Sequence, residues 1–298
     1  MLKKQKILVI VGPTASGKSA LAVSLARKYN GEIISADSRQ VYRGLDIGTG
    51  KVTKREMGNI PHHMLDVSSP KKAFSADDFV RAARRAIDDI SRHGKLPIVA
   101  GGTGFYIDAL IGRIALPDVP PNPALRARLE KKTAAQLFAM LKRRDPRRAR
   151  TIEPKHKRRL IRALEIAAAL GKSPSPRAAV PYDTLWLGIA PPLPELDEKI
   201  ALRLRVRMKR GMISEAKRLH ARGLSYKRME ELGLEYRSLA RFLQGEITQE
   251  QMLEELKHAI RRYARKQIAY WKRNQNIEWF PSPASKEITT QVRKWLKR

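Results

Sequence analysis

The chain has 298 residues, enough for a large buried core, and contains no cysteine, which excludes disulfides, thiolate metal sites and cysteine nucleophiles. Its 61 Lys and Arg residues outnumber its 29 Asp and Glu residues, and the formal net charge of +32 predicts a polyanionic partner, unless this charge serves solubility alone. No apolar run approaches the roughly 18 residues that span a bilayer, and the first residues lack a signal-peptide pattern, so we expect a cytoplasmic protein without a membrane partner.

The first elements of the chain alternate between strand and helix. Residues 6–11 form a short apolar run rich in β-branched residues, which predicts a buried parallel strand, and residues 19–29 carry apolar side chains at helical spacing. Two more buried strands are predicted over 32–36 and 96–100, with a helix between them that begins after Ser75. This alternation predicts an α/β fold with a doubly wound parallel sheet.

The segment between the first strand and the first helix fits the phosphate-binding loop (P-loop) pattern G-x-x-x-x-G-K-[ST]. In such a loop, glycines let backbone N–H groups converge on phosphate oxygens, the lysine supplies a positive charge and the final hydroxyl can bind Mg²⁺. Ser19 is therefore the predicted metal ligand. The predicted diphosphate-binding residues are Gly12, Pro13, Thr14, Ala15, Ser16, Gly17, Lys18 and Ser19.

Nothing in the pattern requires a nucleotide. An ATPase would usually add a strand that ends in a metal-binding acid, but the strand over 96–100 runs into Gly101-Gly102-Thr103-Gly104. The available acid is Asp37, after the strand over 32–36, at the edge of the sheet where the sites of such folds gather. Asp37 could bind magnesium, accept a proton from a second substrate, or only cap a turn at the strand end.

The composition changes at Asp118, where a proline-rich segment begins. Residues 118–180 contain 17 Lys and Arg residues, five Asp and Glu residues and no convincing strand. Within them, residues 155–171 have the pattern of a basic helix that ends at a glycine. We therefore predict an all-helical insertion.

Beyond the insertion, residues 184–190 are predicted to return to the first sheet as a strand. Long basic helices are predicted over 194–222 and 248–274. The predicted organisation has three parts: the first part of a P-loop α/β core (1–117), a basic helical insertion (118–180), and a segment that completes the core (181–298).

Several segments of unusual sequence are distributed along the whole chain. They are GPTASGKS (12–19), SADSRQVYRGLDIGTGK (35–51), IPHHMLD (60–66), FSADDF (74–79), VAGGTGFYI (99–107), RRLIRALEI (158–166), GIAPP (188–192), RRYARKQIAYWKR (261–273) and IEWF (277–280). Their order and spacing resemble those of the bacterial tRNA dimethylallyltransferases, also called tRNA isopentenyltransferases. The resemblance covers nearly the whole chain.

This resemblance implies a function and a set of catalytic residues. The P-loop would hold dimethylallyl diphosphate, and the five-carbon group would pass to N6 of the adenosine that follows the tRNA anticodon (position 37 of the tRNA), with diphosphate and Mg²⁺ released. Asp37 would accept the proton, since a carboxylate helps a weakly nucleophilic aromatic amine to attack. The resemblance also implies that Thr103 and Arg126 lie near the reacting centre and that Arg203 contacts the diphosphate.

The resemblance further implies that the insertion and the basic body bind the tRNA anticodon stem-loop, and we expect a monomer. At the third implied contact segment, residues 232–239, this chain carries one residue more than the family pattern. The implied tRNA contacts are Asp37, Ser38, Arg39 and Gln40; Arg158, Arg159, Leu160, Ile161 and Arg162; and Tyr236 and Arg237.

Other aromatic and histidine residues remain open to two interpretations. Tyr263, Tyr270 and Trp271 lie among basic residues and could stack on bases, although aromatic residues on helices more often belong to a core. His62 and His63 match a family pair, but adjacent side chains diverge and no third ligand is evident, so we expect no metal there.

Three other functions are weighed against tRNA prenylation. A prenyltransferase that acts on free adenine nucleotide would not need the basic insertion. A small-molecule kinase would use the P-loop for ATP and ignore prenyl diphosphate. A non-catalytic RNA-binding protein would not need to keep Lys18, Ser19, Asp37 and Thr103.

Overall fold

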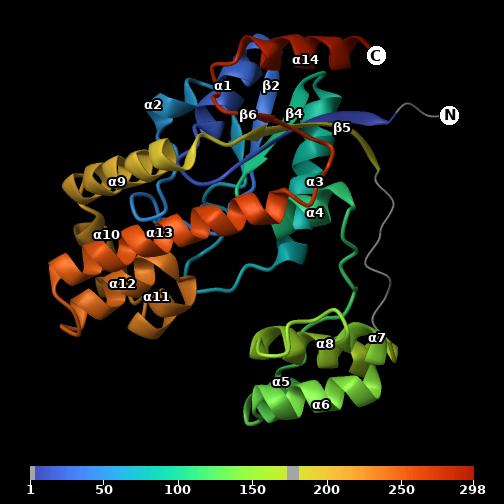
Figure 1. Ribbon diagram of the computed structural model, residues 1–298, viewed down its shortest axis with the longest axis vertical. Helices are drawn as coiled ribbons and strands as arrows, with labels where there is room; N and C mark the ends of the chain where they lie inside the picture. Colours follow the sequence, from blue (N-terminus) through green and yellow to red (C-terminus); the bar gives the residue numbers. More distant parts are fainter. Residues whose placement is uncertain (1–3, 173–180) are drawn as a thin grey trace. The chain divides into compact units, whose positions relative to one another are not determined.

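The computed structural model describes residues 4–172 and 181–298 (Figure 1). The chain divides into two compact units, which are described separately. The larger unit combines residues 1–111 with residues 181–298, and the smaller unit consists of residues 112–180. Among the described residues, no helix has both the length and the apolarity to cross a membrane.

The larger unit contains a sheet of six parallel strands in the order β3-β2-β4-β1-β5-β6. The central strand β1 is flanked by β4 and β5, and its residues Ile7 to Val11 are fully buried. The predicted return of the chain to the first sheet after the insertion is therefore confirmed by β5. The strands are β1 (Gln5–Val11), β2 (Gly31–Ser35), β3 (His62–His63), β4 (Leu96–Gly101), β5 (Tyr182–Ile189) and β6 (Ile277–Phe280).

Helices cover both faces of this sheet. Helices α1 (Lys18–Lys28) and α14 (Lys286–Lys297) share a hydrophobic core with side chains of β1, β2, β4 and β5. Helix α3 (Ala76–Arg92) packs on β2 and β4 and against α4 (Gly104–Ile111). The connections through α1 and α3 run in opposite directions along the sheet, and right-handed crossovers then place these two helices on opposite faces. The predicted doubly wound α/β fold is confirmed.

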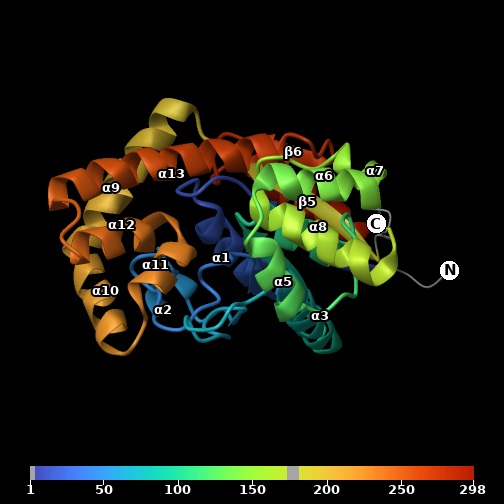
Figure 2. The ribbon, with the colours of Figure 1, turned by 90° about the horizontal axis from the view of Figure 1, so that it is seen from below.

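A second group of helices has its own hydrophobic core in the larger unit and lies at one side of it in Figures 1 and 2. The sequence predicts one helix over 194–222, but the structure has two, because Gly211 has a φ of 92° and begins a new helix. The short helix α2 (Lys54–Met57) follows the loop after β2. The second group comprises α9 (Leu193–Lys209), α10 (Met212–Ala221), α11 (Tyr226–Leu232), α12 (Leu234–Leu243) and α13 (Gln249–Trp271).

In the described residues of the smaller unit, 112–172, the regular secondary structure is helical. Its core is formed by leucine, isoleucine and alanine side chains of all four helices and of the turn before α8. Helix α8 ends at Gly171, as the sequence predicts. The predicted end of the insertion, residues 173–180, lies outside the described residues. The helices are α5 (Pro123–Glu130), α6 (Ala134–Arg144), α7 (Pro146–Ala149) and α8 (Lys157–Leu170).

Candidate active site

The P-loop joins β1 to α1, so that its backbone lies at the carboxyl end of the central strand. The carbonyl of Pro13 accepts a hydrogen bond from Ser16 N at 3.3 Å and from Lys18 Nζ at 3.0 Å. Gly17 adopts a left-handed conformation, with a φ of 91°, and begins α1. The first turn of an 11-residue helix therefore faces the loop, with the exposed Ser19 hydroxyl beside it.

A cavity at the same edge of the sheet brings together segments that are distant in the sequence. The P-loop, the end of β2 and the loop after it, the end of β4, and helices α9, α12 and α13 all contribute to it. Five of the predicted site residues lie here with the P-loop residues: Asp37, Arg39, Gln40 and Arg203, and Tyr263 from the aromatic set. The lining residues are Thr14, Lys18, Ser19, Ser35, Asp37, Arg39, Gln40, Thr49, Gly50, Ala100, Gly101, Arg203, Leu234, Glu235, Ile260, Tyr263 and Gln267.

The electrostatics of the cavity suit an anion. Burial lowers the pKa of Lys18 to about 8; the carboxylate of Asp37 opposes this shift, and the positive charge of Arg203 adds to it. A diphosphate placed against Lys18 and Arg203 would offset both the burial and the repulsion between the two cations. The cavity therefore favours a ligand with two or more negative charges.

Asp37 has both a structural role and a place in the cavity. Its Oδ1 accepts hydrogen bonds from Arg39 N at 2.8 Å and Gln40 N at 3.3 Å, which forms the turn expected of an acid at a strand end. Thr103 supports the same turn, because its Oγ1 accepts a hydrogen bond from Ser38 N at 3.0 Å. The turn fixes the orientation of the carboxylate, and the side chain still lines the cavity.

Gln267 is a site residue that the sequence analysis missed. Its Oε1 accepts a hydrogen bond from Thr14 N at 2.8 Å, and its Nε2 donates to the carbonyl of Gly102 at 3.0 Å. A Cβ atom on Gly102 would lie 2.1 Å from Gln267 Nε2, so a larger residue here would displace the amide. The buried amide on α13 therefore joins the P-loop to the glycine-rich segment after β4.

Two arginines of α9 reach the loop that contains Gly48 and Gly50. Arg203 Nη2 donates to the carbonyl of Gly50 at 3.5 Å, and Arg207 Nη1 donates to the carbonyl of Gly48 at 2.7 Å. Arg207 also pairs with Glu235 at 2.8 Å. Arg203 is therefore placed at the cavity wall by a backbone contact.

The aromatic residues of α13 separate into core and cavity positions. Trp271 is 1% exposed and packs against Trp186, so it belongs to the core. Tyr270 donates to Asp108 Oδ2 at 2.6 Å, and the Arg273 guanidinium lies over its ring. Tyr263 lines the cavity, where burial and the nearby Asp37 carboxylate raise its pKa, so its hydroxyl keeps its proton.

Residues 232–239, which carry one residue more than the family pattern, lie at the junction of α11 and α12. Gly233 and Leu234 both have positive φ there. Tyr236 is 1% exposed, and its hydroxyl donates to Glu215 Oε1 at 2.7 Å. Arg237, next to it, is exposed. A contact between Tyr236 and RNA stays a prediction, and the observed position of its side chain is in the core.

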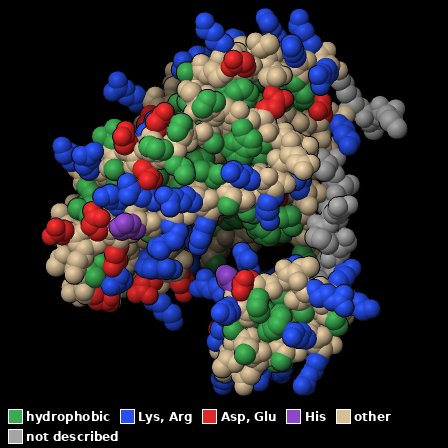
Figure 3. Space-filling model, viewed as in Figure 1, with side chains coloured by type: hydrophobic (Ala, Val, Ile, Leu, Met, Phe, Trp, Pro, Cys, Tyr) green, Lys and Arg blue, Asp and Glu red, His purple; other side chains and the backbone are tan. Residues whose placement is uncertain are grey.

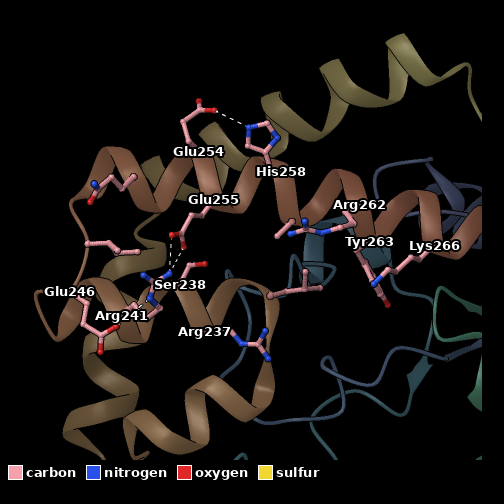
Figure 4. Close-up of a pocket in the computed structure, with 14 residues that line it drawn as sticks. Arg237, Ser238, Arg241, Glu246, Glu254, Glu255, His258, Arg262, Tyr263 and Lys266 are labelled. Atoms are coloured by element: carbon pink, nitrogen blue, oxygen red, sulfur yellow. Dashed lines mark hydrogen bonds and ion pairs between the residues drawn. The ribbon is translucent and has the colours of Figure 1, made fainter. Parts of the chain in front are cut away.

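A larger groove adjoins the cavity, and Leu234 and Tyr263 line both. Arg237 on α12 and Arg262 and Lys266 on α13 line the groove near these shared residues, as Figure 4 shows. On the face drawn in Figure 3, Lys and Arg side chains gather along α13.

The far end of the groove differs in charge. There, Arg241 pairs with Glu255 and Glu246, and Glu254 lies 3.7 Å from His258. Among the described residues, the groove cations without an ion-pair partner therefore lie at the end next to the cavity.

In the smaller unit, Arg126 donates from Nε to Glu165 Oε1 at 2.9 Å and from Nη2 to Oε2 at 2.8 Å. Arg162 pairs with the same carboxylate. Burial raises the pKa of Glu165, but hydrogen bonds from Arg126, the backbone of Asn122 and Arg162 outweigh it and bring the value to about 2. The ion pair fixes the guanidinium of Arg126 within this unit.

The predicted RNA-contact segment of α8 has two faces. Leu160 and Ile161 are buried in the core of the smaller unit, whereas Arg158 and Arg159 are exposed. The two arginines therefore present positive charge to solvent, and the two apolar residues hold the helix in place.

Each histidine of the pair has its own hydrogen-bond partner. His63 Nε2 lies 2.7 Å from Glu32 Oε2, and His62 Nδ1 lies 2.8 Å from the carbonyl of Ile60. No group of three or more His, Cys, Asp and Glu side chains suited to a metal occurs among the described residues.

Comparison with known proteins decides the family. The family model described as IPP transferase matches residues 40–275. The chain belongs to the IPP transferase family. This confirms the resemblance drawn from the sequence motifs.

Relatives within the family match almost the full length. A tRNA dimethylallyltransferase of Roseiflexus sp. (strain RS-1) is 40% identical over 300 residues, which cover 97% of this chain and 98% of the relative. A tRNA dimethylallyltransferase 1 of Geotalea uraniireducens (strain Rf4) is 42% identical over 267 residues, which cover 90% of this chain and 88% of the relative.

Solved structures of family members have the same fold. The full-length tRNA isopentenylpyrophosphate transferase from Bacillus halodurans superposes with a TM-score of 0.75 at 35% identity, over 99% of this chain and 97% of that one. A eukaryotic dimethylallyltransferase, described in crystallographic snapshots as acting on tRNA, superposes with a TM-score of 0.83 at 26% identity, over 97% of this chain and 77% of that one.

Proposed function

We propose that this member of the IPP transferase family transfers a dimethylallyl group from dimethylallyl diphosphate to N6 of the tRNA adenosine that follows the anticodon (position 37 of the tRNA), and releases diphosphate. The observation that carries the proposal is one cavity in which Lys18 and the P-loop lie with the carboxylate of Asp37. The cavity continues along Leu234 and Tyr263 into a groove with exposed cations. The relatives with full-length matches bear the name of this activity.

The donor would bind through its diphosphate. The first turn of α1, the Lys18 ammonium and the Arg203 guanidinium lie at the cavity wall where this group would bind. These groups also stabilise the negative charge that grows on the diphosphate as it leaves. Mg²⁺ held by Ser19 and the diphosphate would supply further positive charge to the leaving group.

Asp37 would accept the proton that N6 of the adenosine loses during the transfer. The N6 lone pair forms a bond to the carbon that bears the diphosphate, and the bond between that carbon and oxygen breaks. The N6 proton passes to Asp37, whose Oδ1 is oriented by the N–H groups of Arg39 and Gln40. Thr103 keeps the turn in position through Ser38 N. The predicted role of Arg126 near the reacting centre stays part of the proposal.

The tRNA would bind to positive charge on both units. In the larger unit, Arg237, Arg262 and Lys266 line the groove beside the cavity. In the smaller unit, Arg158 and Arg159 are exposed on α8. These groups would neutralise backbone phosphates, and Ser38, Arg39 and Gln40 would contact the target base and its neighbours. The tRNA anticodon stem-loop as the bound part, a monomeric state and a cytoplasmic location stay predictions.

A paired incubation tests the proposal. Unmodified tRNA with adenosine after the anticodon is mixed with the protein and Mg²⁺, with dimethylallyl diphosphate in one tube and ATP in the other, and digested nucleosides are identified by mass spectrometry. We expect N6-prenylated adenosine in the first tube alone. Prenylation of free AMP but not of tRNA would support the free-nucleotide prenyltransferase instead, and phosphoryl transfer from ATP would support a kinase.

A further inference from the structure

A buried carboxylate on α10 binds the loop that forms one wall of the cavity. Glu215 is 4% exposed, and its Oε2 accepts hydrogen bonds from Asp46 N at 3.0 Å and Ile47 N at 2.7 Å. Its Oε1 accepts from Gly48 N at 2.8 Å and from the hydroxyl of Tyr236 at 2.7 Å. Three consecutive backbone N–H groups therefore bind one side chain that comes from more than 160 residues further along the chain.

The loop held by Glu215 reaches the diphosphate position through its next residues. Thr49 and Gly50 line the cavity. The carbonyls of Gly48 and Gly50 accept hydrogen bonds from Arg207 and Arg203, respectively. The N–H side of the loop is thus bound by a carboxylate and the carbonyl side by guanidinium groups, so the position of the loop sets the position of Arg203.

The loop also packs tightly against the residue that shares this carboxylate. A Cβ atom on Gly48 would lie 2.7 Å from the ring and hydroxyl of Tyr236. Gly48 therefore lies in direct contact with the aromatic ring, and a small outward movement of the loop would break both the ring contact and the hydrogen bond to Glu215.

From this geometry we propose that Glu215 is a positioning residue for the donor diphosphate: by binding residues 46–48, it holds the cavity wall and Arg203 in the arrangement that receives the diphosphate. This role rests on the proposed function. It requires the negative carboxylate, because each of its two oxygens accepts two hydrogen bonds. An amide presents one acceptor and one donor, so in either orientation at least one loop N–H group would face an NH₂ group.

Glu215→Gln tests the role because it replaces one carboxylate oxygen with an NH₂ group and leaves the rest of the side chain unchanged. We expect the KM for dimethylallyl diphosphate to rise about tenfold, while the KM for tRNA changes less than twofold. The matched control is Glu32→Gln, which removes a carboxylate of 12% side-chain exposure paired with Lys95 and His63 at the opposite end of β2 from Asp37. The control should lower the melting temperature and leave both KM values unchanged, so it separates loss of stability from loss of diphosphate binding.

Gly48→Ala gives a second, independent test if Glu215→Gln folds poorly. The added methyl group pushes the loop away from Tyr236 without altering a charge. We expect the same rise in the donor KM and little change in the tRNA KM. Equal changes in both KM values, or none, in the folded variants would overturn the role.

A binding measurement that needs no turnover separates the positioning role of Glu215 from the proposed transfer to tRNA. Inorganic diphosphate is titrated into wild type and both variants by calorimetry, and we expect its Kd to rise about tenfold in Glu215→Gln. If wild type binds diphosphate and the variant binds it more weakly, but tRNA is never prenylated, the positioning role stands and the proposed reaction fails. If tRNA is prenylated and diphosphate binding is equal in both proteins, the proposed reaction stands and the positioning role fails.

Discussion

The bridge made by Gln267 offers a direct test of how the site is assembled. Gln267→Met keeps the length of the side chain but removes the acceptor for Thr14 N and the donor for the carbonyl of Gly102. A buried polar group left without a partner costs about 1–3 kcal/mol. Gly102 is buried, whereas Thr14 is half-buried and can reach water, so we assign Thr14 the lower end of the range. The costs at the Gly102 carbonyl and the Thr14 N–H group add to a loss of about 2–4 kcal/mol in the free energy of unfolding.

Tryptophan fluorescence can follow this loss in one unit alone. All four tryptophans of the chain, Trp186, Trp271, Trp279 and Trp295, belong to the larger unit. For a unit of this size, the expected loss corresponds to a fall of roughly 5–15 °C in melting temperature. Because the P-loop would lose a fixed point beside Thr14, we also expect the KM for dimethylallyl diphosphate to rise about tenfold, equivalent to about 1.4 kcal/mol.

A glutamine at the end of α12 serves as the control. Gln244 is exposed and donates to the carbonyl of Ala240 in its own helix, so Gln244→Met should leave the melting temperature and the donor KM nearly unchanged. An unchanged melting temperature for Gln267→Met would refute the reasoning, because two backbone groups of the site would then be satisfied without the amide.

Four further perturbations address separate parts of the proposal. Asp37→Ala should abolish prenyl transfer but leave the Kd for tRNA within a few-fold; a collapse of tRNA binding equal to the loss of activity would remove the assignment as proton acceptor. Charge reversal at Arg158 and Arg159 should weaken tRNA binding and flatten its dependence on salt, which a filter-binding series from low to high salt measures; an unchanged slope would place this segment away from the RNA. Because Lys18 has a pKa of about 8 and binds anions only when protonated, the KM for dimethylallyl diphosphate should rise as the pH increases above 8, and a profile that stays flat to pH 9 would contradict this. Because the pKa of Glu165 is about 2 in the folded protein and about 4.5 otherwise, its stabilising effect is complete above pH 4.5 and declines as the pH falls toward 2. The protection of α8 amides, measured relative to their intrinsic exchange rates, should therefore fall in that window, and Glu165→Gln should remove the dependence.

Local sequence patterns predicted much of the sheet and its helices. The P-loop between β1 and α1 and the strands β2, β4 and β5 were predicted because each is specified by neighbouring residues. The strands β3 and β6 were missed, since they have two and four residues and depend on pairing with β2 and β5. The break at Gly211 was also missed, although a glycine within a helical pattern is a visible signal.

The structure also distinguished among interpretations that the sequence left open. Trp271 lies on the same face of α13 as the buried Ala264 and belongs to the core, whereas Tyr263 lines the cavity. Asp37 both caps a turn and lines the cavity, so its structural role does not remove it from the site. Periodicity alone could not separate these cases, because it shows which residues share a face but not what that face contacts.

The sequence by itself determined the family, the P-loop with Lys18 and Ser19, and the excess of positive charge, because each resides in residue identity and short-range spacing. The tertiary structure alone decided that Gln267 and Glu215 bind the backbone of the site. Both come from helices that follow the insertion, and each gains its role from N–H groups more than 160 residues away. Backbone hydrogen-bond partners carry no sequence signature, so only the folded chain reveals which side chain meets them.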